Sequence, residues 1–212
     1  SMVKIAVPST LQQSIVHIGI LLVQSVINSF GSTAIAGYSA GMRIESLSIV
    51  PMLAMGNAMS TFTAQNMGAG KIDRVKEGYR MCYVIVLTAG AVLCVMYQLA
   101  GGAFVSLFLD SGSSEAYSVG LSYVKFLSFF YSFIGLKAST DGLLRGAGDV
   151  TAFTVANLVN LAIRVSVTNL FAPIYGIQVA WMAVPLGWAA NYVISFGWYL
   201  TGKWKKVRVI KK

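Results

Sequence analysis

Polar side chains recur at helical spacing inside a long apolar stretch at residues 151–172. Asn157, Asn160 and Arg164 follow one another at intervals of three and four residues, which places them on one face of an α-helix. Arg164 comes 13 residues after the stretch begins. An arginine that deep in a bilayer costs about 2.5–3.5 kcal/mol on insertion scales, so it requires water or a partner. We therefore predict that this face points into the protein.

The first apolar stretch, residues 9–29, has a polar face of its own. Its members are Gln13, His17, Gln24 and Asn28, at steps of four, seven and four residues. On a helix these positions fall within about 60° of one another. The face either lines an interior cavity shared with Arg164 or supplies hydrogen bonds between helices. For His17, the corresponding alternatives are a hydrogen-bonded structural histidine and a proton site.

A third candidate site combines opposite charges at helical spacing. Lys137, Asp141 and Arg145 lie four residues apart, so two cations can bracket one carboxylate. The arrangement is either a neutralising ion pair near the membrane surface or a titratable carboxylate that exchanges partners. Asn57, in the stretch 43–66, is a further polar residue on a helix face that the ion or substrate pathway could use.

Four basic residues oppose two acids inside the predicted spans, which leaves a charge of +2: Arg43, Lys125, Lys137 and Arg164 against Glu45 and Asp141. Such an interior binds cations poorly, so either another chain supplies acids or the ligand is amphiphilic or anionic. One histidine and no ligand cluster predict no metal site, and no motif predicts an enzyme or a cofactor.

The elements that carry these residues are membrane helices. The chain of 212 residues is 56% hydrophobic and 11% charged, with a mean hydropathy of +0.70, whereas soluble domains carry about 25% charged residues. Lipid must therefore cover most of its surface. Apolar stretches near the length of about 20 residues that a spanning helix needs predict an all-α bundle of six transmembrane helices: 9–29, 43–66, 80–100, 117–142, 151–172 and 177–200.

Basic residues between the predicted helices lie on one side of the membrane. Lys4, four residues at 71–80, Arg145 and six residues at 203–212 all fall on that side, whereas the opposite loops hold Asp110 and Glu115 and no Lys or Arg. The positive-inside rule then predicts a multi-pass protein of the cell membrane with both termini in the cytoplasm. The basic tail 203–212 follows the bundle at 1–202, and we expect it to contact anionic lipid rather than nucleic acid.

Two glycine-ended segments resemble the cytoplasmic motifs of the multidrug and toxic compound extrusion (MATE) transporters. They are Thr-Ala-Gln-Asn-Met-Gly-Ala-Gly at 63–70, followed by Arg74, and Gly-Leu-Leu-Arg-Gly-Ala-Gly-Asp at 142–149. Met-Arg-Ile-Glu at 42–45 and Gly-Lys-Trp-Lys at 202–205 fit the same pattern. The resemblance covers essentially the whole chain but only the second half of such a transporter, whose twelve helices form two six-helix lobes.

The resemblance implies a lobe of an antiporter that exchanges small amphiphilic compounds for H⁺ or Na⁺ by alternating access. Its partners would be the lipid bilayer and either an N-terminal lobe or a second copy of this chain. Some branches of the family carry an acid on the helix that matches 9–29, where this chain has Gln13 and His17. Others carry one midway along the helix that matches 117–142, whereas Asp141 lies closer to the cytoplasmic end. These departures imply coupling through the first lobe or altered coupling.

Two other functions fit the same residues. A flippase for lipid-linked or anionic amphiphiles would suit the positive interior. A membrane scaffold without transport would use the polar faces only to hold helices together.

Replacing Arg164 tests whether its helix face serves transport. We expect Arg164→Leu to impair substrate flux in liposomes more than folding, because the guanidinium is placed deep in the membrane for a purpose other than packing. Flux and the thermal unfolding midpoint are measured on the same preparation. Unchanged flux would refute the prediction.

Overall fold

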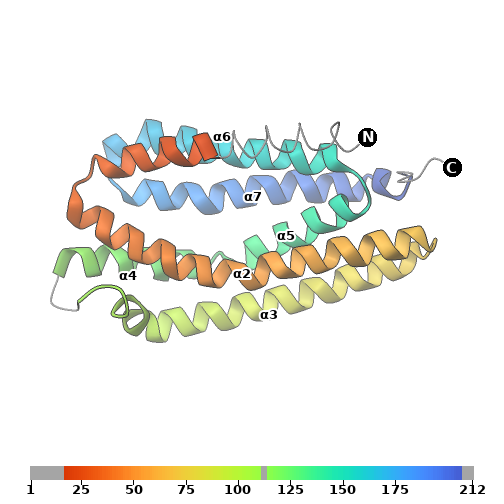
Figure 1. Cartoon of the computed structure of the whole chain (residues 1–212), viewed down its shortest axis with the longest axis horizontal. Helices are drawn as coiled ribbons and strands as arrows, with labels where there is room; N and C mark the ends of the chain where they lie inside the picture. The colour runs from red at the N-terminus through yellow and green to blue at the C-terminus, as the bar shows by residue number, and fades with distance from the viewer. Residues whose placement is uncertain (1–16, 111–113, 207–212) are drawn as a thin grey trace.

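The computed structural model describes residues 17–110 and 114–206, and every regular element within them is helical. A helix at His17–Asn28 precedes the labelled elements of Figure 1: α2 Ser32–Gly68, α3 Ile72–Val105, α4 Ser114–Ser128, α5 Tyr131–Gly146, α6 Val150–Tyr175, α7 Gln178–Leu200 and the 3₁₀ turn η1 Lys203–Lys206. The predicted all-α membrane fold is confirmed.

Four of these helices are long and apolar enough to cross a membrane, namely α2, α3, α6 and α7, and α4 with α5 makes a fifth when the bent pair counts as one span. Only part of the predicted span 9–29 lies in the described residues. The span predicted at 43–66 belongs to a helix that begins at Ser32. Its first turns contain Gly37 and Gly41, where the absence of a side chain lets α2 pack directly against Val119 and Tyr123 of α4.

The segment predicted as the span 117–142 is not one straight helix, because it breaks at Phe129 and Phe130 and α5 leaves α4 at 53°. A break frees backbone groups that cannot meet water in a membrane, so other side chains must pair with them. Gln98 of α3 donates to the Lys125 carbonyl at 2.8 Å and to the Ser128 hydroxyl at 2.9 Å. The Ser128 hydroxyl donates to the same carbonyl at 2.7 Å.

Helices α2 and α5 pack with their backbones in contact. A Cβ atom on Gly142 would collide with the carbonyl oxygen of Gly56, and one on Gly146 would collide with that of Ser60. Small residues allow this close approach, which replaces the hydrophobic effect as a source of helix association in lipid. The contact holds the Asp141 region of α5 firmly against α2.

The helices form two layers joined by α5. Figure 1 shows His17–Asn28, α6 and α7 in one layer and α2, α3 and α4 in the other, with α5 crossing between them. The α2–α3 turn, the α5–α6 turn and η1 lie at the same end of the bundle, so Lys71, Arg145 and Lys203 gather there. η1 is packed on the bundle rather than free in a tail, because buried Trp204 stacks on Tyr199 at 5.7 Å between ring centres.

We predict that Gln98→Leu destabilises the fold by about 1–3 kcal/mol, the usual cost of leaving a buried polar group unpaired. The substitution removes the donor that serves the broken turn between α4 and α5. Thermal unfolding in detergent, followed by circular dichroism, measures the effect. The exposed Gln65 provides the control, and a Gln98→Leu protein as stable as Gln65→Leu would contradict the assigned role.

Candidate functional site

An ion pair lies buried where α5, α6 and α7 meet. The Lys137 Nζ atom is 3.1 Å from the Asp141 Oδ2 atom, and the two side chains are 13% and 6% exposed. Ser195 of α7 donates its hydroxyl to Asp141 Oδ1 at 2.6 Å. Lys137 also donates to Asn157 Oδ1 of α6 at 3.2 Å. We name these four residues together with Asn191 the Asp141 cluster.

The Asp141 cluster is neutral overall but incompletely hydrogen-bonded. The side-chain nitrogen of Asn191 is buried and has no hydrogen-bond partner among the described residues, although its oxygen lies 3.5 Å from the Ser195 hydroxyl. In a buried ion pair, the attraction between the two charges is largely offset by the cost of removing both from water, so the pair adds little net stability. Its presence between membrane helices is instead typical of an ion or substrate pathway.

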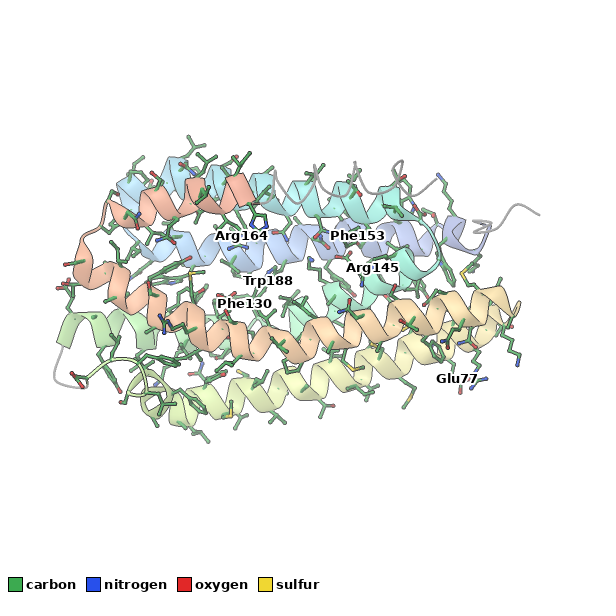
Figure 2. All side chains as sticks on the ribbon, viewed as in Figure 1. Glu77, Phe130, Arg145, Phe153, Arg164 and Trp188 are labelled. Atoms are coloured by element: carbon green, nitrogen blue, oxygen red, sulfur yellow. The ribbon has the colours of Figure 1, made fainter. Side chains whose placement is uncertain are left out.

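Arg145 does not bracket Asp141 as the spacing predicted. It donates across to α2 instead, from Nη2 to Asn57 Oδ1 at 2.8 Å and from Nε to the Ser60 hydroxyl at 3.4 Å. Its guanidinium also lies 5.6 Å from the centre of the Phe153 ring, as Figure 2 shows at the junction of α5 and α6. The glycine contacts bring α2 within reach, so the arginine finds partners outside the Asp141 cluster.

Hydroxyl groups connect the helices next to Asp141. Thr140 lies within hydrogen-bond distance of Tyr79 and Tyr83 of α3, at 2.7 Å and 2.8 Å. Tyr83 donates in turn to Tyr192 of α7 at 3.3 Å. This chain of hydroxyls ties α3, α5 and α7 together and extends the polar interior beyond the ion pair.

A second polar cluster surrounds Glu45. The Tyr123 hydroxyl of α4 donates to the Glu45 carboxylate, and the Tyr38 ring meets the Tyr123 ring edge-on at 5.2 Å. Arg164 of α6 lines the same small hollow as Tyr38. We name Tyr38, Glu45, Tyr123 and Arg164 the Glu45 cluster. Its members come from α2, α4 and α6.

A small hollow opens beside Arg164. Gln24 of the first described helix and Tyr38 of α2 line it together with apolar residues, and its volume is about 20 Å³. That volume holds about one water molecule. In this conformation the hollow is therefore hydrated at most and too small for an organic substrate.

The polar residues predicted to share one cavity are divided between separate places. Asn160 packs against Gly187 of α7, and its buried side-chain oxygen has no partner among the described residues. His17 and Asn28 are exposed, and Gln24 donates to Asn28 at 2.9 Å. Gln13 lies outside the described residues. Among the described residues of the first polar face, Gln24 alone lines the hollow beside Arg164.

Sequence reasoning missed Tyr38 and Tyr123, and it counted Glu45 only as a charge. Spacing along α2 could not reveal the donor to Glu45, because that donor comes from α4, 78 residues further along the chain. The signal that was available was the acid itself: a glutamate within an apolar span has to find a donor or a cation.

The sequence model of the MatE family matches residues 8–170, and the chain belongs to this family. A probable multidrug resistance protein of Bacillus subtilis, YpnP, is 28% identical over 97% of the chain and 46% of its own length. A second from that organism, YoeA, is 24% identical over 99% of the chain and 45% of its own length.

A crystal structure described as MATE in the straight conformation superposes with a TM-score of 0.85. It is 16% identical and matches 98% of the chain but 46% of that structure. At this identity the likeness establishes the fold alone. The chain thus spans about half the length of the relatives and structures it matches.

The buried ion pair predicts an asymmetric response to mutation. Lys137→Met leaves the Asp141 carboxylate buried without a cation and should cost about 3–5 kcal/mol of stability, whereas Lys137→Met with Asp141→Asn should cost clearly less. We expect Asp141→Asn alone to perturb assembly more than the pH profile of transport. Unfolding in detergent and size-exclusion chromatography measure these effects.

Lys76→Met is the control, because Lys76 pairs with Asp73 at 2.6 Å on the surface, where such pairs contribute about 0–1 kcal/mol. Equal losses for Lys76→Met and Lys137→Met would contradict the prediction. A shifted pH profile with intact assembly in Asp141→Asn would assign coupling to Asp141.

Proposed function

We propose that the chain is one lobe of a secondary transporter that exports small amphiphilic compounds in exchange for H⁺ or Na⁺. The observation that carries the proposal is the presence of two ionisable clusters, around Asp141 and Glu45, between membrane-crossing helices of a MatE-family fold. Ionisable side chains are costly in this environment and mark pathways for ions and substrates. The relatives' description as multidrug resistance proteins supports the same class of substrate.

Transport by alternating access requires a second lobe. The chain matches less than half of its relatives, and transporters of this kind rock one helical repeat against another around a central site. The partner is an N-terminal six-helix lobe or a second copy of the chain, and the lipid bilayer surrounds both. The common end of the α2–α3 turn, the α5–α6 turn and η1 carries the basic residues, so we place that end and both termini in the cytoplasm.

An apolar groove suits the non-polar part of an amphiphile. It lies between the α4–α5 break and α7 and has a volume of about 320 Å³, within the range of ligand pockets. Phe130, labelled in Figure 2, lies at the break. The lining consists of aromatic, aliphatic and methionine side chains: Phe126, Phe130, Phe133, Met182, Pro185, Leu186 and Ala189.

The hollow beside Arg164 favours a second candidate function, a flippase for anionic amphiphiles. Arg164, Gln24 and Tyr38 all present hydrogen-bond donors there. These donors would bind a phosphate or carboxylate headgroup rather than a cationic one.

The two functions predict different cargo in one reconstituted system. The chain is placed in liposomes together with a six-helix partner lobe, and efflux of a lipophilic fluorescent cation is followed under a pH gradient or a Na⁺ gradient. We expect efflux several-fold above empty liposomes under at least one gradient. Dithionite quenching of a fluorescent anionic lipid measures flipping in the same vesicles. If neither cargo moves with either partner, the scaffold function is the correct one.

A further inference from the structure

Glu45 is an acid in the bundle interior that forms no salt bridge with any described residue. It is buried, and its hydrogen bond comes from the Tyr123 hydroxyl. The titratable or charged groups that face it are Tyr38 on its own helix, Tyr123 on α4, Tyr131 on α5 and Arg164 on α6. Helix α7 contributes the Trp181 ring, which packs edge-on against Tyr123 at 5.7 Å.

The Glu45 carboxylate differs from the Asp141 carboxylate because it has no salt-bridge partner among the described residues. A lysine of the same helix already lies 3.1 Å from Asp141 and neutralises it. The cation on the side of Glu45 is Arg164, which stands on a different helix: Arg164 lines a hollow together with Tyr38, and the Tyr38 ring packs on Tyr123, the donor to Glu45. Gaining a proton therefore displaces no bound cation from Glu45, whereas at Asp141 it would break an ion pair.

The two charges also lie in different layers of the bundle. Glu45 and its donor Tyr123 belong to the layer of α2, α3 and α4, whereas Arg164 belongs to the layer of α6 and α7 (Figure 1). In a medium of low dielectric constant, attraction between opposite charges extends beyond hydrogen-bond distance. The pair thus draws the two layers together as long as the glutamate is ionised.

We propose that Glu45 is a proton-binding carboxylate of this lobe and that its protonation ends the longer-range attraction to Arg164, which loosens the α6–α7 layer from α2 and α4. The inference rests on the proposed transport function, because it describes the step at which the driving ion binds. One proton from hydronium in the aqueous phase bonds to Oε1, the carboxylate oxygen that Tyr123 does not contact, which leaves a water molecule and a neutral carboxylic acid.

The charge balance of this step gives it a direction. Before protonation the carboxylate and the guanidinium sum to zero, and afterwards the cluster carries +1 from Arg164 alone. A state in which the layers are apart is then favoured, because the attraction that opposed it has gone. The uncompensated guanidinium also repels a cationic group and attracts an anionic one, so proton binding and cation binding exclude each other.

Infrared difference spectroscopy of the reconstituted lobe pair tests the proton site directly. A step from high to low pH should produce the C=O stretching band of a carboxylic acid, and Glu45→Gln should remove that band. Glu77→Gln is the matched control: Glu77 is exposed on α3, as Figure 2 shows, and an exposed glutamate stays ionised above about pH 6. The inference is overturned if the band survives in Glu45→Gln.

Spin labels at exposed Leu99 of α3 and Leu170 of α6 report the separation of the layers, with Cys82 and Cys94 replaced by serine. We expect the distance to increase at low pH in the parent protein and in Glu77→Gln. Glu45→Gln, which keeps an acceptor for Tyr123, should show the longer distance at every pH, and Glu45→Asp should restore the pH response. A pH response that is absent from the parent or unchanged in Glu45→Gln overturns the inference.

Flux measurements separate this inference from the proposed function. Efflux driven by a pH gradient should fall at least tenfold in Glu45→Gln and remain unchanged in Glu77→Gln. Flux that persists in Glu45→Gln refutes the role of Glu45 and leaves the transport function standing. A proton-dependent band and distance change without flux of any cargo refutes the transport function instead.

Discussion

A charge inside a lipid-embedded bundle has to be met by an opposite charge or by hydrogen-bond donors, and the interior of this chain is organised by that requirement. It is met in two ways. Lys137 and Asp141 neutralise each other within one helix and collect Asn157 and Ser195 from its neighbours. Glu45 instead takes a tyrosine hydroxyl from α4 and the more distant charge of Arg164 on α6. The first arrangement connects three helices, and the second leaves a buried carboxylate that forms no salt bridge with any described residue.

Hydropathy and helical periodicity predicted most of the fold because both depend on local sequence. The apolar stretches marked the helices, and the spacing of Lys137 and Asp141 correctly indicated a pair. Where a residue's partner lies on another helix, spacing within its own helix did not predict the contact. Arg145 has the same spacing from Asp141 but turns to Asn57, because glycine contacts place α2 beside it. The break at Phe129 and Phe130 was equally hidden, since Gln98, which compensates for it, lies on another helix.

The candidate site was predictable only in its parts. Arg164, Asn157 and Asp141 were found as polar residues in apolar stretches, but their grouping was not, because one helix face does not reveal which helix lies opposite. The expected single cavity is instead two clusters and a hollow of about 20 Å³. The chain belongs to the MatE family through residues 8–170 and spans about half the length of the curated relatives it matches.

The amide of Gln98 has a consequence for the leakage of protons through the bundle. A bent helix in a membrane normally exposes carbonyl groups that recruit water, and a file of water molecules conducts protons. Here a side-chain amide and the Ser128 hydroxyl occupy those hydrogen-bonding positions at the bend. The Lys125 carbonyl at the kink between α4 and α5 therefore needs no water molecule as a partner. A bend of this kind leaves one carbonyl fewer at which a proton-conducting file of water molecules could begin.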